Sequence, residues 1–446
     1  MKKYYKGETS KAVQNFQISG VFVSLKMIYS VAVVKKAAAE ANNKIGRLSR
    51  EKYLAISRAV DKILLGEFDT QFVTDQVQGG AGTSTNMNVN EVISSVAEEI
   101  LKDKITVHPN DDVNMGQSTN DVIPTAIKLT LAKLMDELLI EMKKLKSAFH
   151  HKSKEFKNII KVGRTHLQDA VPMTLGQSFG AYEAFVDRNI ERLEENKKYV
   201  FTTNLGGTAI GSGINSSKTY IKEVNKNLAR LTKYPFKSAN NLFDATQNSD
   251  DLLHIASLLQ TFTAGMSKIS NDLRFLSAGP RAGLGELILP EVQKGSSIMP
   301  GKVNPVILEL MNQICYQVFG NVETAFHVVL NSQFELNAML PIYVKNMIEA
   351  FTVMKNGIKT FREKAILGIK PNHNKIKDLF DNSLCMATAL NRYIGYDKTA
   401  EIVKKAIQNN TGLIEELKKE SGLNKGMIIR ILNPQRLTEP TDIFEK

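Results

Sequence analysis

The fold is decided by residues 122–154, VIPTAIKLTLAKLMDELLIEMKKLKSAFHHKSK. Their apolar side chains recur at steps of three and four residues, the spacing that places side chains on one face of an α-helix. The stripe consists of Ile127, Leu131, Leu134, Leu138, Met142, Leu145 and Phe149. At about 1.5 Å of rise per residue, this segment predicts a helical rod on the order of 45 Å long.

Four further segments carry the same helical period and similar length. They are residues 173–199, 245–278, 306–331 and 340–366. Five long amphipathic helices predict a helical bundle. The segment PVILELMNQICYQVFGN (305–321) is apolar on more than one side, which indicates that neighbouring chains cover its second side.

The composition is that of a globular protein and narrows the class of partner. The chain has 446 residues, 43% of them apolar, and a formal net charge of +12. Its lysines are spread along the whole sequence without aromatic interleaving, so we expect no nucleic-acid partner. With only Cys315 and Cys385, no disulfide framework is expected, and a reducing cytoplasm is the predicted compartment.

An apolar stretch near the N-terminus imitates a signal peptide. It runs over residues 21–34 behind Lys2, Lys3 and Lys6. Lys26 interrupts it, and it is too short to span a bilayer. We expect a helix that enters a core, and no membrane partner.

Polar, glycine-rich stretches lie between the predicted rods. They are GGAGTSTNMNVNE (79–91), HPNDDVNMGQSTND (108–121), GRTHLQDAVPMTLGQ (163–177) and the segment 279–305. Loops of this kind, held on rigid helices, commonly carry binding chemistry. We expect them to be loops that supply the functional site, with a smaller helical segment from about residue 370 to the end.

Two of these stretches predict anion binding from their residues alone. GSSIMPGKVNP (295–305) is a loop with glycines near both ends, and its backbone N–H groups, Lys302 and Asn304 could hold an anion. Ser118, Thr119 and Asn120 directly precede the longest rod, where a helix N-terminus favours a carboxylate. A purely structural loop and plain helix capping are the respective alternatives.

Residues 295–305 resemble the shared fingerprint of the superfamily that contains fumarase, aspartase, argininosuccinate lyase and adenylosuccinate lyase. The resemblance extends through the other three polar stretches and covers nearly the whole chain. It implies that Ser296 is the catalytic base, which removes a Cβ proton beside a carboxylate. It also implies that substrate carboxylates are held by a set of polar side chains: Thr83, Ser118, Thr119, Asn120, Thr165, Lys302 and Asn304.

The same resemblance implies a role for a histidine. His166 follows Thr165 and would pair with Glu309 on the helix after the mobile loop. The Thr165–His166 pair precedes the predicted bundle helix over residues 173–199. The other histidines show no metal-ligand spacing, so no essential metal and no cofactor are expected; they are His108, His150, His151, His254, His327 and His373.

Within the superfamily, the aspartase branch is favoured. Residues 312–315, Asn-Gln-Ile-Cys, resemble the aspartase pattern, as do Thr119 and Ala282, whereas Gly207 and Gly301 are common in fumarases. The implied reaction is reversible deamination of L-aspartate to fumarate and ammonia through an aci-carboxylate intermediate. A class II fumarase, which converts malate to fumarate and water, and a catalytically silent structural paralogue are the alternatives.

The expected architecture is all-α with three domains: residues 1–118, a central five-helix bundle over 119–371, and residues 372–446. The doubly apolar helices predict a homotetramer, because a monomer would expose large apolar faces. Because long rods separate the polar loops along the chain, each active site is expected to draw on three chains and to bind a small dicarboxylate.

Overall fold

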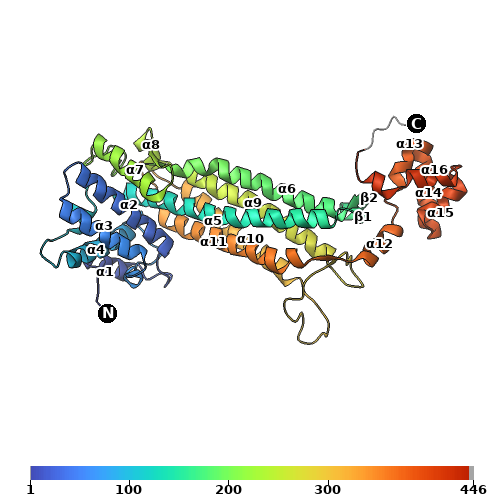
Figure 1. Ribbon diagram of the computed structural model, residues 1–446, viewed down its shortest axis with the longest axis horizontal. Coiled ribbons are helices and arrows are strands. Elements are labelled where there is room, and N and C mark those ends of the chain that lie inside the picture. Colours follow the sequence, from blue (N-terminus) through green and yellow to red (C-terminus); the bar gives the residue numbers. More distant parts are fainter. Residues whose placement is uncertain (1, 441–446) are drawn as a thin grey trace. The chain divides into compact units, whose positions relative to one another are not determined.

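The computed structural model describes residues 2–440, which form a mainly helical protein (Figure 1). The chain divides into two compact units, each built from discontinuous segments. The first contains the residues up to Ile140 with Asn189–Ala264 and Ile314–Asn356, and the second contains Glu141–Arg188, Gly265–Gln313 and the residues from Gly357 onward. The prediction of three domains stays a prediction.

The five predicted rods are confirmed as the five longest helices. They are α5 (Thr119–Glu155), α6 (Leu175–Asn196), α9 (Asp250–Leu276), α10 (Val306–Leu330) and α11 (Leu340–Lys364). Each contributes a segment to both units. In the first unit, Lys355 on α11 bonds Glu137 on α5 at 2.8 Å, and the Tyr343 hydroxyl on α11 donates to the Leu252 carbonyl on α9 at 2.8 Å.

The rest of the first unit surrounds the beginning of α5. Helix α2 packs against α3 and α7, and α3 packs against α4. These elements are α1 (Gly7–Asn15), α2 (Leu25–Lys44), α3 (Arg50–Leu64), α4 (Thr83–Ile100), a π-helical turn (Pro109–Val113), α7 (Lys218–Thr232), α8 (Leu242–Gln247) and the parallel pair β3 (Thr202–Thr203) and β4 (Lys237–Ser238). The expected helix over residues 21–34 is confirmed by the buried helix α2.

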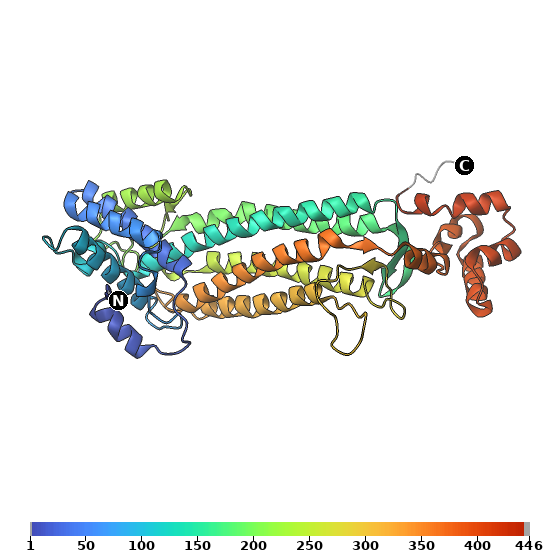
Figure 2. The ribbon, with the colours of Figure 1, turned by 60° about the horizontal axis from the view of Figure 1, so that its bottom comes forward.

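The second unit holds two small antiparallel sheets and the C-terminal helices. Strands β1 (Ile160–Thr165) and β2 (Gln168–Thr174) form a hairpin, and β5 (Leu287–Ile288) pairs with β6 (Lys370–Pro371). The C-terminal helices are α12 (His373–Asp381), α13 (Asn391–Ile394), α14 (Tyr396–Asn409), α15 (Leu413–Glu420) and α16 (Lys425–Ile431). Helices α13–α16 gather around one small core that includes Leu390, Ile402 and Leu417 (Figure 2).

Aromatic side chains form the centre of the bundle segments in the second unit. Phe149 of α5 lies 6.3 Å from Phe179 and 5.7 Å from Tyr182, both on α6, and 6.5 Å from Phe361 on α11, measured between ring centroids. These rings meet at the tilted and edge-to-face angles that aromatic pairs prefer. None of the described helices has the length and apolarity needed to cross a membrane.

Two predicted loops are regular structure, and both predictions were wrong. Residues 79–91 were expected to be a loop, but α4 begins at Thr83 and contains most of them. Its asparagines Asn86, Asn88 and Asn90 are buried, and their contacts outweigh the low helix propensity of this composition. Residues 163–177 were also expected to be a loop, but most belong to the β1–β2 hairpin.

Candidate functional site

The first cluster of predicted site residues lies at the N-terminus of α5. The Ser118 hydroxyl accepts the Asn120 N–H at 3.2 Å, and Asp121 accepts the Ser118 N–H at 3.0 Å. Ser118 thus acts as the N-cap of α5, and Asp121 pairs its backbone N–H in return, so that N–H groups that the first helical turn would leave free are paired. Because the Ser118 oxygen accepts from the backbone, its O–H hydrogen remains available to a ligand.

Pro124 explains how Asn120 is fixed. Proline lacks an N–H, so the carbonyl four residues earlier has no helical donor. That carbonyl belongs to Asn120, and the Asn204 side-chain amide donates to it at 2.9 Å. The Asn120 amide in turn donates to the Ala209 carbonyl at 2.8 Å. The side chain of Asn120 is therefore tied to the segment that follows residue 204.

The side chain of Thr119 is positioned by a hydrogen bond from helix α4. The Asn86 amide donates to the Thr119 hydroxyl oxygen at 3.3 Å. With its oxygen serving as an acceptor, the Thr119 hydroxyl can donate its hydrogen to a carboxylate. Ser118, Thr119 and Asn120 therefore form a half-buried set of polar groups at a helix N-terminus, the kind of place where an anion is stabilised.

Thr83 begins α4 and is arranged differently. Its side chain is exposed, and its hydroxyl donates to the Gly80 carbonyl at 2.8 Å. Gly82, just before it, has φ +89, and a Cβ there would approach Ile123 to 3.1 Å. This packing sets α4 against α5. Thr83 would have to release its bond to Gly80 before it could donate to a substrate.

Two buried ionisable groups lie behind this helix terminus. Burial raises the pKa of Asp121 to about 6, although its carboxylate accepts the N–H groups of Gly206 at 3.0 Å and Thr208 at 2.9 Å. Burial also lowers the pKa of Lys35, on α2, to about 7. The Lys35 ammonium group donates to Asn114 Oδ1 at 2.6 Å and to Gln117 Oε1 at 3.1 Å. Residue composition alone did not predict either group.

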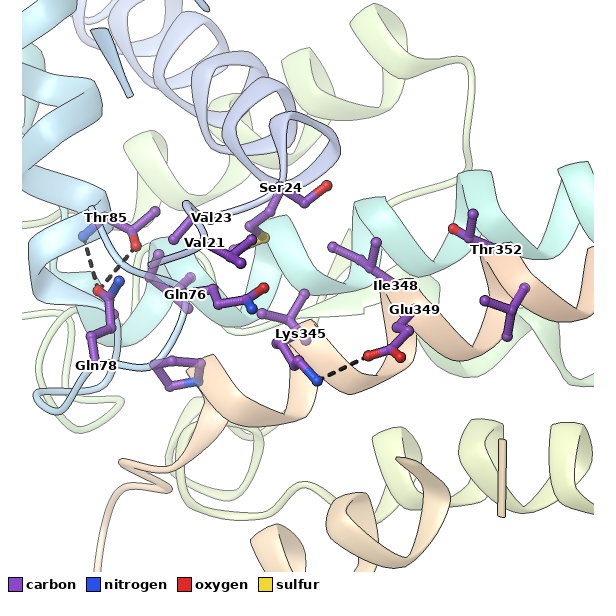
Figure 3. A pocket seen from close by; sticks show the side chains of 16 residues that line it. Val21, Val23, Ser24, Gln76, Gln78, Thr85, Lys345, Ile348, Glu349 and Thr352 are labelled. Carbon is purple, nitrogen blue, oxygen red and sulfur yellow. Dashed lines mark hydrogen bonds and ion pairs between the residues drawn. The ribbon is translucent and has the colours of Figure 1, made fainter. Parts of the chain in front are cut away.

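Two cavities lie in the first unit. One of about 450 Å³ is lined by Ser118, Asn114, Gln117 and Thr208. The other, of about 420 Å³, lies among α2, α4 and α11 and is mostly apolar (Figure 3). Its polar groups are largely paired with one another: Gln78 accepts from Thr85, and Lys345 bonds Glu349 at 2.9 Å. The first cavity is therefore the polar space beside Ser118 that a ligand could enter.

Thr165 and His166 lie in the second unit at the tip of the β1–β2 hairpin. Thr165 pairs with Gln168, so His166 and Leu167 form a two-residue turn, with φ +54 and +61. The pair precedes the bundle helix α6, as expected, but strand β2 lies between them, because α6 begins only at Leu175. Both Thr165 and His166 are exposed, and the turn presents the imidazole to solvent.

A buried charge cluster supports this hairpin. Glu286, with 1% of its side chain exposed, accepts Arg164 Nη1 at 2.6 Å and lies 3.1 Å from Lys161 Nζ. Lys161 and Arg164 are on β1, whereas Glu286 immediately precedes β5. Burial lowers the pKa of Lys161. The cluster joins the strand that carries Thr165 to the segment that leads toward residues 295–305.

Residues 295–305 form a loop that is closed at its neck. The Asn304 side-chain amide donates to the Gly295 carbonyl. A Cβ on Gly295 would stand 1.8 Å from the Lys302 carbonyl oxygen, so only glycine allows this approach. In both views the segment between α9 and α10 leaves the helices as an extended loop (Figure 1, Figure 2). Asn304 therefore shapes the loop, and Lys302 is exposed on it.

Ser296 is held within this loop by two backbone donors. Its hydroxyl oxygen accepts the N–H groups of Ile298 at 3.2 Å and Met299 at 3.0 Å. Two N–H donors on one oxygen stabilise negative charge on that oxygen. The Ser296 hydroxyl can still donate its hydrogen to a ligand.

Glu309 lies in the first turn of α10, after the loop. Among the described residues, neither the Glu309 carboxylate nor the His166 imidazole has a hydrogen bond or ion pair. The predicted pairing of the two is therefore absent within one chain and stays a prediction for an assembly. No cluster of three or more His, Cys, Asp or Glu side chains in residues 2–440 could hold a metal ion.

Comparison with known proteins identifies the family. A family model described as "Lyase" matches residues 1–320, and one described as "Fumarase C C-terminus" matches residues 386–439. Aspartate ammonia-lyase of Bacillus subtilis (strain 168) is 44% identical over 441 residues, which cover 98% of this chain and 93% of that protein. The chain belongs to the class II fumarase/aspartase superfamily. It is therefore a lyase of this superfamily.

Fumarases of the superfamily are nearly as similar. Class II fumarate hydratase of Halalkalibacterium halodurans (strain ATCC BAA-125 / DSM 18197 / FERM 7344 / JCM 9153 / C-125) is 39% identical over 442 residues, covering 98% of this chain and 96% of that protein. The crystal structure of recombinant class II fumarase from Schistosoma mansoni matches with a TM-score of 0.97 at 34% identity, covering 99% of this chain and 97% of that chain. The fold is therefore that of the superfamily.

Proposed function

We propose that this lyase deaminates L-aspartate reversibly to fumarate and ammonia. Aspartate ammonia-lyase of B. subtilis is 44% identical, against 39% for the fumarate hydratase of H. halodurans. The sequence Asn312-Gln313-Ile314-Cys315 resembles the same branch. Asn312 is buried and accepts Arg274 Nη1 at 3.2 Å, and Cys315 is also buried, so this run supports the bundle rather than touching substrate.

The observation that carries the chemistry is the pair of N–H donors on Ser296. A serine hydroxyl is a poor base, and it can accept a proton from carbon only as an alkoxide. The Ile298 and Met299 N–H groups stabilise such an oxygen anion, as a preorganised oxyanion site does. In the proposed reaction, Ser296 takes the Cβ proton of aspartate and the C–H electron pair moves into the adjacent carboxylate, forming the aci-carboxylate.

The second half of the reaction expels the amine. The electron pair returns from the aci-carboxylate to form the carbon–carbon double bond, and the Cα–N bond breaks to release ammonia. The proton on Ser296 then passes to ammonia, so aspartate yields fumarate and ammonium. In this proposal, the substrate carboxylates are bound by Lys302, Asn304, Thr165 and Thr83, together with the Ser118–Asn120 set. The proposed partner of the leaving group or carboxylate is His166, oriented by Glu309.

We further propose a homotetramer whose active sites combine residues from three chains. The Ser118–Asn120 set and Thr83 lie in the first unit. In the second unit, no hydrogen bond or ion pair among the described residues joins His166 to Ser296 or Glu309. On α10, Tyr316 is 61% exposed, Leu330 is 62% exposed, and Leu310 and Phe326 are also exposed. Apolar faces of this size favour burial against other copies of the chain.

The test is to incubate the purified protein with L-aspartate and, separately, with L-malate, and to follow the ultraviolet absorbance of fumarate. The proposal requires fumarate from aspartate at a far higher kcat/KM than from malate. The reverse preference would assign the chain to the fumarases, which the Schistosoma mansoni structure supports as the second candidate. Turnover of neither substrate by a folded tetramer would favour the silent paralogue.

A further inference from the structure

Lys35 is a buried cation without a carboxylate bound to it. Its side chain has 0% exposure in the middle of α2, and its ammonium group donates to two neutral oxygens, Asn114 Oδ1 and Gln117 Oε1. Neutral acceptors offset only part of the cost of removing an ammonium group from water. A buried lysine in this setting gains free energy when a negative charge comes near.

Both acceptors are oriented by their own N–H groups. The Gln117 amide donates to the Val113 carbonyl at 3.0 Å, and the Asn114 amide donates to the Gln117 carbonyl at 3.2 Å. Each side chain therefore directs its oxygen at Lys35. The ammonium group fixes the conformation of residues 114–117, which lead directly into Ser118.

A chain of hydrogen bonds connects Lys35 to Thr119. Asn114 Oδ1, which accepts from Lys35, also accepts from Asn86 Nδ2 at 3.2 Å and Asn90 Nδ2 at 3.3 Å. Asn86 Nδ2 also donates to the Thr119 hydroxyl at 3.3 Å. Lys35 thus orients Asn114, and Asn114 orients Asn86. Because Asn86 donates to the Thr119 oxygen, the Thr119 hydroxyl can donate its hydrogen to an anion.

We propose that Lys35 is a positioning residue of the Ser118–Asn120 carboxylate site, and that it takes up a proton when a dicarboxylate binds there. This inference rests on the proposed carboxylate-binding role of Ser118–Asn120. It does not depend on whether aspartate or malate is the substrate. The ligand class is a small dicarboxylate, whose negative charge would lie at the N-terminus of α5 and favour the ammonium form of Lys35.

Other ionisable groups lie near Lys35, among them Arg47, Asp111 and Asp112. Asp121 on α5 interacts electrostatically with Lys35, and Tyr220 on α7 interacts with Asp121 and with Arg47. The facing residues of α4, Asn86 and Asn90, do not titrate. Burial lowers the pKa of Lys35 to about 7 and raises that of Asp121 to about 6, whereas that of Tyr220 lies well above its ordinary value. At about pH 8, Lys35 is therefore the group in this layer that can gain a proton.

The experiment is calorimetric titration of the assembled wild-type protein with succinate, a non-reactive dicarboxylate, at about pH 8, where both succinate carboxylates are ionised. Running it in HEPES and in Tris, which differ in ionisation enthalpy, gives the number of protons taken up. We expect uptake of a few tenths of a proton per bound succinate. The Lys35→Met variant should lose this uptake and bind succinate more weakly by about tenfold or more, and its fumarate production should show a raised KM.

Binding of succinate by the wild-type protein without proton uptake would overturn the proposal, and this result needs no variant. Uptake that persists in a folded Lys35→Met protein would also overturn it, because another group would then be titrating. Failure of succinate and fumarate to bind at all would refute the carboxylate site and this inference together. Uptake with normal binding, but without turnover of aspartate, would support Lys35 and refute only the proposed reaction.

Discussion

Asn304 donates its side-chain amide to the carbonyl of Gly295, nine residues earlier, and closes the loop that carries Ser296. Gly295 also approaches the Lys302 carbonyl closely. The neck of the loop therefore depends on the side chain of Asn304 at one end and on the lack of a side chain at Gly295 at the other. This relationship explains why a glycine and an asparagine flank the proposed base, independently of any contact with substrate.

The neck predicts a strong effect of Gly295→Ala. The new Cβ would stand 1.8 Å from the Lys302 oxygen, and forcing such overlap costs about 1–3 kcal/mol. We expect kcat to fall by about 5- to 150-fold if that cost opens the closed loop. Gly301→Ala serves as the comparison within the same loop: its Cβ would meet no atom within 4 Å, so that only the backbone strain at φ +77 remains. A greater loss in the control would contradict the prediction.

From the contacts of Glu286 we predict which substitution destabilises the β1–β2 hairpin of the second unit. Glu286→Gln leaves Lys161 and Arg164 buried without their shared carboxylate, and breaking a buried ion pair in this way costs about 3–5 kcal/mol. We expect faster amide hydrogen exchange over residues 160–174 and a lower kcat. The control is Asp169→Asn, because Asp169 is 56% exposed and lies 3.9 Å from Arg164 Nε. Unchanged exchange in Glu286→Gln would refute the supporting role.

The sequence predicted the long helices well because their apolar stripes continue over many turns. Residues 306–331 and 340–366 were predicted, and α10 and α11 end within two residues of these limits. The hairpin at 160–174 was missed because its polar residues and Pro172 interrupt the alternation that indicates a strand. The start of α4 was missed because Thr83, Asn86 and Asn88 have low helix propensity, and only tertiary contacts stabilise them as a helix.

The candidate site was predictable in part. Ser118–Asn120 could be placed at a helix N-terminus from the apolar stripe that follows them, and the loop at 295–305 from its glycines. Lys35 gave only a weak signal, as a charge within an apolar helix, because its acceptors lie far away in the sequence at Asn114 and Gln117. The position of His166 at a turn depends on hairpin register, which the sequence did not reveal.

Lys35 also predicts a pH dependence of stability. Its pKa is about 7 in the folded chain against the ordinary 10.5, so between these values the unfolded chain binds more protons. Stability must then rise with pH across this window, by up to about 1.4 kcal/mol per pH unit. Compared with Lys35→Met, the wild-type protein should gain stability between about pH 7 and about pH 9 in urea denaturation. A constant difference between the two proteins would refute this.

If each active site combines residues from several chains, as we propose, inactive subunits should complement one another. Ser296→Ala and His166→Ala proteins, unfolded, mixed and refolded together, should form tetramers in which some sites receive both wild-type residues. We expect partial recovery of fumarate production, whereas each variant refolded alone stays inactive. Light scattering should first establish that the mixtures are tetrameric. If mixed tetramers recover no activity, sites built from several chains are ruled out.

The proposed role of Ser296 is to remove the Cβ proton of aspartate, and a variant series separates this role from binding. Ser296→Ala should lower kcat by on the order of 10³-fold or more with little change in succinate affinity, because the lost interaction exists mainly in the transition state. The matched control is Ser297→Ala. Ser297 is the neighbouring exposed serine, and its hydroxyl has no partner among residues 2–440.

The most direct measurement is exchange of the Cβ hydrogens of L-aspartate in heavy water, followed by proton NMR in the presence of ammonium and fumarate. The wild-type and Ser297→Ala proteins should introduce deuterium at Cβ, whereas folded, tetrameric Ser296→Ala protein should introduce almost none. Exchange by Ser296→Ala at the wild-type rate would show that another group takes the proton and would refute the role of Ser296 as the base.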